Sequence, residues 1–236
     1  MTTLLVIQHE DEDPVGLLGA EWVAEGIDLD IRCGWVGDPV PTVIDPAEHA
    51  GVVVLGGYMG ADDDHEHAWL TPTKALLRAV VRDGIPTLGI CLGHQLLASA
   101  LGGSVGRNPA GRTLGMAPIG WEPAAADDAL VTGLGGGLGD LPVLHYNDDV
   151  ILDLPDGAVV LARTADGAPQ VVRFAPTVWG VQFHPEVEVE MFTSWSDVPA
   201  EVTRAAYAAQ PALRLTGTVI AARFAALLPP VSTIDQ

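Results

Sequence analysis

Hydrophobic positions along the chain form short apolar runs that alternate with longer stretches of helical periodicity. The apolar runs lie at residues 4–7, 51–55 and 85–90. The helical stretches lie at residues 15–25, 70–83 and 92–101. Short apolar runs of this kind are typical of strands covered on both faces. With a further alternating strand at 29–36, the pattern predicts an α/β fold, a flavodoxin-like doubly wound and mostly parallel sheet with helices on both faces.

The second half of the chain has a different pattern, in which strand-like runs follow one another through tight turns. These runs lie at residues 113–121, 144–152, 159–163, 169–174 and 178–183. They predict a small antiparallel sheet packed against the parallel core. The glycine-rich stretch 133–139 is interpreted as a plain connection.

Helical patterns close the chain, at residues 187–196, 200–209 and 212–228. No linker or internal repeat divides the sequence. We therefore expect a single domain over residues 1–236, with a core at about 4–195 and C-terminal helices at about 196–228.

Composition excludes some classes of partner. The formal net charge is −20 and Lys74 is the single lysine, so a nucleic acid or an anionic membrane surface would be repelled. Two cysteines, Cys33 and Cys91, are too few for a disulfide framework. With no signal-like N-terminus and no apolar run of membrane-spanning length, the sequence predicts a cytoplasmic protein.

The candidate for chemistry is Cys91, which follows the apolar run 85–90 and precedes a helical stretch. Gly89 and Gly93 flank it, giving the G-x-nucleophile-x-G pattern of a sharp strand-to-helix turn. Such a turn exposes one side chain at a helix N-terminus, which favours a thiolate and offers free N–H groups to a developing negative charge. The alternative is an ordinary buried cysteine, because a five-residue pattern is short.

A matching base stands at the end of the last strand-like run. His184 is followed by Pro185 and Glu186. The proline restricts the backbone next to the imidazole, and Glu186 is near enough in sequence to accept a hydrogen bond from the ring. A histidine at a strand end is more often only a surface or hydrogen-bonded residue. A Cys-His-Glu triad follows if the fold brings His184 to Cys91.

Two other stretches admit more than one interpretation. Gly56 and Gly57 end the strand at 51–55, where a glycine loop can hold a phosphate, begin a dinucleotide site or donate backbone N–H groups to an oxyanion. The G-x-G-x-x-G spacing is absent, which disfavours the dinucleotide site. The His- and Asp-rich stretch 62–67 could bind a metal, but its consecutive side chains diverge, which favours a solvated loop. No metal and no cofactor are predicted.

These motifs together resemble the class I, triad-type glutamine amidotransferase domains, in particular the glutaminase half of GMP synthase and its stand-alone relatives. The resemblance rests on residues 89–95, 183–186 and the glycine pair 56–57, and runs from about residue 4 to about residue 195. It implies Cys91 as nucleophile, His184 as general base and then acid, and Glu186 as the group that orients the histidine.

The resemblance also implies the groups that bind substrate. The N–H groups of Gly57 and Leu92 would form the oxyanion hole, with Gly56 beside them, and Gln95 would hold the glutamine moiety. Main-chain groups near Tyr146 and Asn147 would bind the α-amino and carboxylate ends. Here the chain departs from the family, because residues 145–149 replace a His-x-His-Gly-Asp-like segment.

The expected activity is hydrolysis of the glutamine side-chain amide through a cysteine thioester, giving glutamate and ammonia. The sequence shows no synthetase domain and no ATP-pyrophosphatase loop, so the ammonia would pass to a separate synthetase or acceptor subunit. One alternative is a stand-alone hydrolase of γ-glutamyl peptides or amines that uses the same triad. Another is a catalytically silent regulatory relative, although both the cysteine and the histidine are present.

Overall fold

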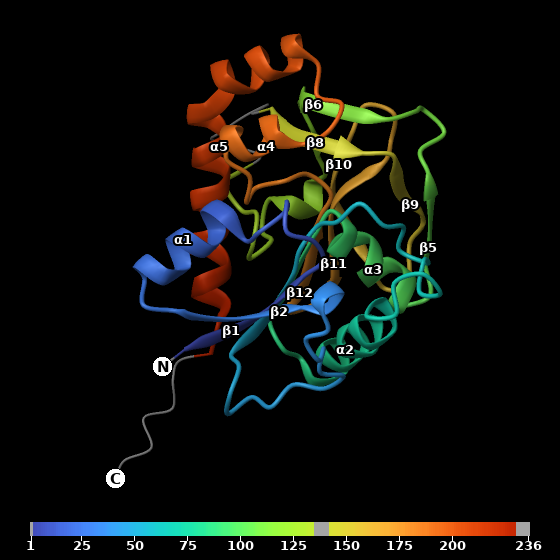
Figure 1. Cartoon of the computed structure of the whole chain (residues 1–236), viewed down its shortest axis with the longest axis vertical. Helices are drawn as coiled ribbons and strands as arrows, with labels where there is room; N and C mark the ends of the chain where they lie inside the picture. Colours follow the sequence, from blue (N-terminus) through green and yellow to red (C-terminus); the bar gives the residue numbers. More distant parts are fainter. Residues whose placement is uncertain (1, 135–141, 230–236) are drawn as a thin grey trace.

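The computed structural model describes residues 2–134 and 142–229, and it is built around one eight-stranded sheet (Figure 1). The spatial order of the strands is β2-β1-β3-β4-β12-β11-β10-β7. Their bounds are β1 Thr3–Gln8, β2 Asp28–Cys33, β3 Gly51–Val54, β4 Thr87–Ile90, β7 Gly120–Trp121, β10 Val159–Arg163, β11 Pro169–Ala175 and β12 Val178–Val181. The glycine-rich stretch expected at 133–139 lies mostly outside the described residues.

The sheet combines a parallel and an antiparallel half. Strands β2, β1, β3, β4 and β12 pair in parallel, which is the flavodoxin-like order predicted from the sequence. Strands β11, β10 and β7 continue the same sheet in antiparallel pairing. The expectation that the run from β10 to β12 packs against the parallel core is therefore wrong. The reason is that β12 is buried along its whole length and pairs with β4 at the sheet centre.

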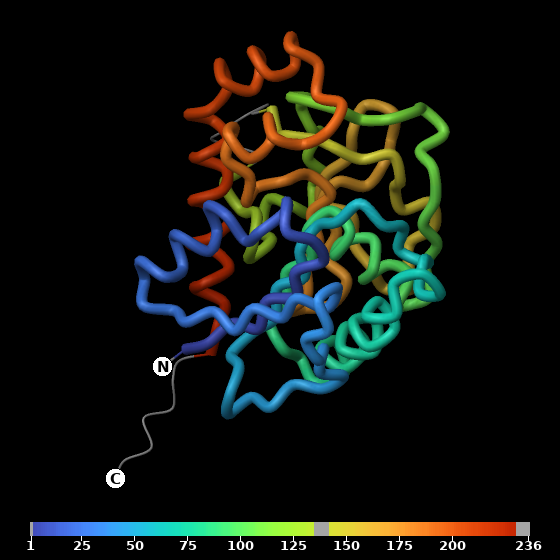
Figure 2. The backbone as a smooth tube through the Cα atoms, viewed as in Figure 1, coloured from blue at the N-terminus to red at the C-terminus, as the bar shows by residue number. Residues whose placement is uncertain are grey.

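Helices cover both faces of the sheet (Figure 1). Helices α1 (Gly16–Ala24) and α5 (Ala200–Leu227) pack side by side on one face, and α2 (Leu70–Asp83) and α3 (Leu92–Ala100) pack together on the other. Figure 2 shows α1 and α5, from opposite ends of the chain, against each other. The indole N–H of Trp22 on α1 donates to the Ala221 carbonyl of α5 over 3.0 Å.

The alternation of β1 fills two hydrophobic cores. Leu4 and Val6 point into the core under α1 and α5, while Leu5 and Ile7 point into the core under α2 and α3. All four side chains are fully buried. A run with no polar alternation is what a strand buried on both faces requires.

Two expected strands are each divided in the structure. The run 113–121 forms β6 (Thr113–Ala117) and β7, which belong to different sheets, and the run 144–152 forms β8 (Val143–Asn147) and β9 (Asp149–Asp153). Strand β6 pairs with β8, and β9 pairs with β5 (Ser104–Arg107), a strand that the sequence pattern did not predict. The chain changes sheet after Pro118 has removed one backbone donor.

The two C-terminal helices expected at 200–209 and 212–228 are one helix, α5, with Pro211 inside it. Proline removes one helical hydrogen bond, here the bond to the carbonyl of Tyr207, whose side chain is 46% exposed, so water can reach that turn. The short helix α4 (Val189–Ser194) precedes it. Within the described residues, no helix has the length and apolar character needed to cross a membrane.

Candidate active site

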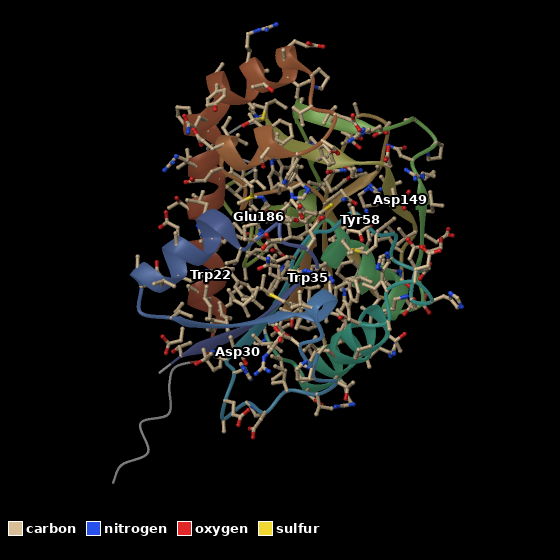
Figure 3. The ribbon with its side chains drawn as sticks, in the orientation of Figure 1. Trp22, Asp30, Trp35, Tyr58, Asp149 and Glu186 are labelled. Atoms are coloured by element: carbon tan, nitrogen blue, oxygen red, sulfur yellow. The ribbon has the colours of Figure 1, made fainter. Side chains whose placement is uncertain are left out.

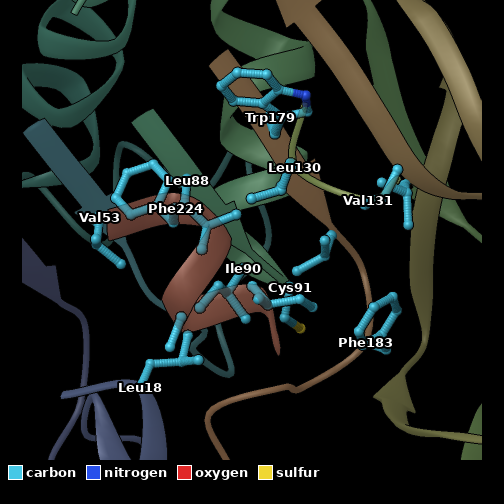
Figure 4. Packing of buried hydrophobic residues seen from close by; sticks show 14 of the residues in the cluster. Leu18, Val53, Leu88, Ile90, Cys91, Leu130, Val131, Trp179, Phe183 and Phe224 are labelled. Atoms are coloured by element: carbon cyan, nitrogen blue, oxygen red, sulfur yellow. The ribbon is translucent and has the colours of Figure 1, made fainter. Parts of the chain in front are cut away.

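Cys91 stands on the sharp turn between β4 and α3, as the sequence predicted. Its backbone has φ +48° and ψ −102°, a conformation that side-chain-bearing residues rarely adopt. Strain of this kind is characteristic of functional turns. The thiol is 6% exposed and lies among apolar side chains, with Ile90 next to it in sequence and Phe183 across from its sulfur atom (Figure 4).

The two flanking glycines are required by close packing. A Cβ atom on Gly93 would lie 2.1 Å from the carbonyl oxygen of Val54, and a Cβ atom on Gly89 would lie 2.6 Å from the backbone of Gly93. The Gly93 N–H donates to the Leu55 carbonyl over 3.1 Å and the Cys91 N–H to the Val181 carbonyl over 2.8 Å. The start of α3 is thus held against the ends of the neighbouring strands.

His184 and Glu186 form a buried pair. His184 is 3% exposed and Glu186 fully buried, and the imidazole Nδ1 lies 2.7 Å from Glu186 Oε1. The backbone N–H of His184 donates to the Leu144 carbonyl of β8 over 3.0 Å, and the Leu17 N–H of α1 donates to the Glu186 carbonyl over 2.8 Å. Figure 3 shows Glu186 beside α1. Contacts from distant segments therefore fix this pair.

The electrostatics link His184 to Cys91. Burial alone would lower the pKa of His184, but the charge of Glu186 and the interaction with Cys91 outweigh burial and raise it well above its usual value. The imidazole therefore holds a proton at neutral pH. Its Nε2 has no geometrically satisfactory hydrogen bond within the described chain, so the interaction with the sulfur is mainly electrostatic. A protonated imidazole stabilises a neighbouring thiolate.

The glycine loop after β3 reaches both members of the predicted pair. A Cβ atom on Gly56 would lie 3.2 Å from Cε1 of His184, and one on Gly57 would lie 3.1 Å from Cδ2 of Leu92. The N–H of Leu92 belongs to the first turn of α3, where backbone donors have no helical acceptor. The structure thus brings Gly57 and Leu92 next to each other, beside Cys91.

Gln95 is held inside the protein by its own amide group. Its Nε2 donates to the Asp149 carbonyl over 3.0 Å and to Oε1 of Gln182 over 3.1 Å. Gln182 in turn places its Nε2 3.6 Å from the Cys91 sulfur. Both amide hydrogens of Gln95 are therefore engaged, which leaves only its Oε1 for a substrate.

Tyr146 and Asn147 end strand β8 near the same site. The Tyr146 ring lies 5.0 Å from the ring of Trp195, which itself lies 5.0 Å from the His184 ring. The guanidinium of Arg112 stands 4.5 Å above the Tyr146 ring. Asn147 donates to the Asp149 carbonyl over 3.1 Å, the same oxygen that accepts from Gln95. The structure thus gathers the residues that the resemblance assigned to catalysis and substrate binding.

Three neighbours of the site carry no sequence motif: Asp13, Gln182 and Trp195. One ligand-type atom from each of Asp13, His184 and Glu186 lies within 4.8 Å of the others. This spacing would suit a metal ion, but the His184 nitrogen on this side already makes the 2.7 Å bond to Glu186. The cluster is better described as a hydrogen-bonded group of two carboxyls and an imidazole.

The acidic stretch 62–67 is bound by the chain's single lysine. Lys74 Nζ lies 3.0 Å from Asp62 and 2.5 Å from Asp64, and Asp63 accepts the Gly60 N–H over 2.7 Å. Positive charge and backbone donors thus occupy these carboxylates, in agreement with a loop rather than a metal site.

The family model for class-I glutamine amidotransferases matches residues 27–194. The chain therefore belongs to this family. The match includes the Cys91 turn, the 184–186 pair and the glycine loop.

Several named proteins share part of this sequence. The A chain of the glutamine-hydrolyzing GMP synthase of Halobacterium salinarum, which is named as one of its subunits, is 34% identical over 138 residues, 58% of this chain and 66% of its own. Anthranilate synthase component 2 of Archaeoglobus fulgidus is 35% identical over 115 residues, 47% of this chain and 57% of its own. GMP synthase of Aeropyrum pernix is 36% identical over 58% of this chain and 24% of its own. The aligned stretch thus spans 24% to 66% of these relatives.

Solved structures share the whole fold. A glutamine amidotransferase from Methylobacillus flagellatus superposes with a TM-score of 0.86 at 23% identity, covering 100% of this chain and 99% of its own. One from Thermotoga maritima gives a TM-score of 0.82 at 24% identity, covering 94% and 97%. At this level of identity the likeness establishes the fold.

Proposed function

We propose that this protein hydrolyses the side-chain amide of glutamine through a thioester on Cys91 and supplies the ammonia to a separate synthetase subunit. The observation that carries the proposal is the strained turn at Cys91 facing an imidazole that Glu186 holds at 2.7 Å. A nucleophile, a base and a group that orients the base are the parts that acyl transfer needs.

The first half of the proposed reaction forms the thioester. The Cys91 thiolate attacks the amide carbon, and the carbonyl oxygen becomes an oxyanion between the N–H groups of Gly57 and Leu92. Each such donor contributes about 10²–10³-fold to the rate in well-studied cases. The carbon–nitrogen bond then breaks, and His184 gives its proton to the leaving nitrogen, which departs as ammonia.

The second half restores the enzyme. His184, now neutral, takes a proton from water while the water oxygen attacks the thioester carbon through a second oxyanion. Breaking the carbon–sulfur bond releases glutamate and returns the Cys91 thiolate beside the protonated His184. Glu186 keeps the imidazole in the orientation that both proton transfers require. The cycle needs no metal or cofactor.

The names of the relatives support a partner. Two of them are designated as one part of a synthase of several chains, by the words subunit and component. In such an arrangement the acceptor enzyme consumes the ammonia. We propose the same division of labour for this chain.

The test is glutamate release by the purified protein from glutamine and from a panel of γ-glutamyl peptides and amines. Cys91→Ala should lower release by more than about 10³-fold, as expected for loss of a nucleophile, and should remain folded. The matched control is Cys33→Ser, which changes the other cysteine and should retain activity.

The substrate preference decides between the alternatives. Preference for glutamine, or activity that begins only when a cell extract is added, supports the amidotransferase role. Faster release from γ-glutamyl compounds would overturn the proposal in favour of a self-sufficient hydrolase. No release under any of these conditions would indicate a silent relative.

A further inference from the structure

A second carboxyl group lies against the predicted triad. Asp13, in the loop between β1 and α1, is 3% exposed. One of its carboxyl oxygens lies within 4.8 Å of ligand-type atoms of both His184 and Glu186. The three other acidic residues of this loop, Glu10, Asp11 and Glu12, are half-buried or exposed. Only Asp13 turns inward.

Close packing holds Asp13 at this place from two sides. A Cβ atom on Gly56 would lie 2.1 Å from Oδ2 of Asp13, so the glycine loop stands directly against the carboxyl. A Cβ atom on Gly16, whose φ is +47°, would lie 2.3 Å from the Glu186 carbonyl oxygen, which also accepts the Leu17 N–H. The start of α1 is thus attached to Glu186, and Asp13 comes three residues before it.

Two buried carboxyl groups at this separation cannot both carry a negative charge. Burial, followed by the charge of Glu186, raises the pKa of Asp13 well above its usual value, whereas the charge of His184 acts in the opposite direction. Glu10 is the remaining charged group that acts on Asp13, and it raises the pKa further. Asp13 is therefore a carboxylic acid at neutral pH, with a proton to donate.

Glu186 has an oxygen free to accept that proton. Its Oε1 is bonded to His184, while its Oε2 is buried and has no partner other than a protonated neighbour within the described chain. A buried carboxylate oxygen without a donor is strongly unfavourable. The geometry supplies one donor candidate, the carboxyl group of Asp13.

We propose that Asp13 is a positioning residue whose protonated carboxyl donates a hydrogen bond to Glu186 and so holds Glu186 in place against His184. The inference rests on the proposed function in that the His184–Glu186 pair is taken to be the catalytic base. It makes the acid–base machinery a group of four residues that share two protons, one on the carboxyl pair and one on the imidazole.

The variants that test this role are Asp13→Asn, Asp13→Ala and the control Asp11→Asn, all in a Cys33→Ser background. Asparagine keeps a donor toward Glu186 but cannot ionise, whereas alanine removes the donor. Asp11 has the same chemistry two residues away and is exposed. Thermal unfolding of each variant shows whether it is folded.

In glutamate release, Asp13→Ala should lower kcat about 10–100-fold with little change in KM, the effect of losing one hydrogen bond to a buried charge. Asp13→Asn should stay within about threefold of the parent, because the donor remains. Its pH–rate profile should lack the alkaline change that ionisation of Asp13 produces in the parent. Asp11→Asn should reproduce the parent profile.

Alkylation of Cys91 by iodoacetamide gives a second measurement that needs no substrate. At neutral pH the rate should fall about tenfold in Asp13→Ala, because a misplaced His184 stabilises the thiolate less. It should be unchanged in Asp13→Asn and Asp11→Asn. This measurement separates the two proposals, since it tests Asp13 even if no glutamine is hydrolysed.

Three results would overturn the role of Asp13. One is an Asp13→Asn variant as impaired as Asp13→Ala, which would mean that a charged carboxylate is needed. Another is a folded Asp13→Ala variant with parental kcat and parental alkylation. The third is an Asp13→Asn pH profile that coincides with that of the parent.

Discussion

The two sides of the site are built in different ways. The nucleophile side is local: the bend at Cys91, the glycines on either side and the first turn of α3 all lie within residues 89–95. The base side is assembled from distant segments, since His184 and Glu186 are held by β8, by α1, by the glycine loop and by Trp195.

This difference determines how each side tolerates change. On the nucleophile side, backbone lies against backbone, as with Gly93 against the Val54 carbonyl. On the base side, the contacts are with the ends of side chains, as with Gly56 against the Asp13 carboxyl. Backbone cannot move without unfolding its strand, whereas a carboxyl group can rotate. We therefore expect changes on the nucleophile side to alter stability and changes on the base side to alter activity.

The largest expected effect is that of Gly93→Ala. The new Cβ atom would lie 2.1 Å from the Val54 oxygen and 2.8 Å from its carbonyl carbon, and this overlap should lower the free energy of unfolding by about 3 kcal/mol or more. Urea unfolding followed by tryptophan fluorescence measures it. The control is Gly102→Ala, where φ is +95° but nothing lies within 4 Å, so only about 1–2 kcal/mol of backbone strain is expected. Equal losses in the two variants would contradict the local description.

The same contrast explains what could be predicted from the sequence. The order of strands and helices follows from hydrophobic periodicity, and the Cys91 turn from five consecutive residues, because both are encoded locally. His184 and Glu186 were also within reach, since they lie two residues apart at a strand end.

What surrounds the base could not be predicted. Asp13 is one of four acidic residues in a row, and nothing local distinguishes it from Asp11. Gln182 and Trp195 approach the site only through the pairing of β12 with β4 and the packing of α4. The division of residues 113–121 between two sheets likewise depends on which partner strands are available, and periodicity does not carry that information.

A second, smaller effect is expected from Gly56→Ala on the base side. The added methyl group must displace the Asp13 carboxyl and press on His184, so kcat should fall about 10–100-fold, as for a small misplacement of a catalytic group. Stability should fall by about 1–2 kcal/mol, less than for Gly93→Ala. Steady-state glutamate release and urea unfolding measure the two quantities.

The control for this change is Gly60→Ala in the same loop. Its Cβ atom would also meet an aspartate carboxyl, Oδ2 of Asp63 at 2.9 Å, but this one lies away from the site. Gly60→Ala should therefore retain kcat within about twofold, since no catalytic group moves. A Gly56→Ala variant with the kcat of Gly60→Ala would refute the idea that side-chain contacts position the base.

The smallest expected effect concerns how stability changes with pH, and it has opposite signs on the two sides. His94, in α3 on the nucleophile side, is fully buried, and burial lowers its pKa to about 3. Burial also lowers the pKa of His9 to about 3 and that of His145 to about 4. Between about pH 6 and pH 5 the unfolded chain protonates these histidines while the folded protein does not, so stability falls as the pH falls.

Asp13 opposes this trend. Its pKa is raised in the folded protein, so in the same range the folded state binds a proton that the unfolded state lacks, and stability from this group is lost as the pH rises. Each proton changes the slope by about 1.4 kcal/mol per pH unit. Three histidines against one carboxyl leave a net loss of about two protons' worth of stability per unit of acidification.

Urea unfolding at about pH 6 and about pH 5 should therefore separate two variants in opposite directions. His94→Gln should make the loss of stability on acidification shallower by about one proton, because one buried neutral imidazole is removed. Asp13→Asn should make it steeper by about one proton, because the only opposing group of the four is removed. His65→Gln, a change at an exposed side chain, provides the control. Slopes that move in the same direction in the first two variants would show that Asp13 is ionised in the folded protein, and the carboxyl pair at the base would then have to hold two negative charges.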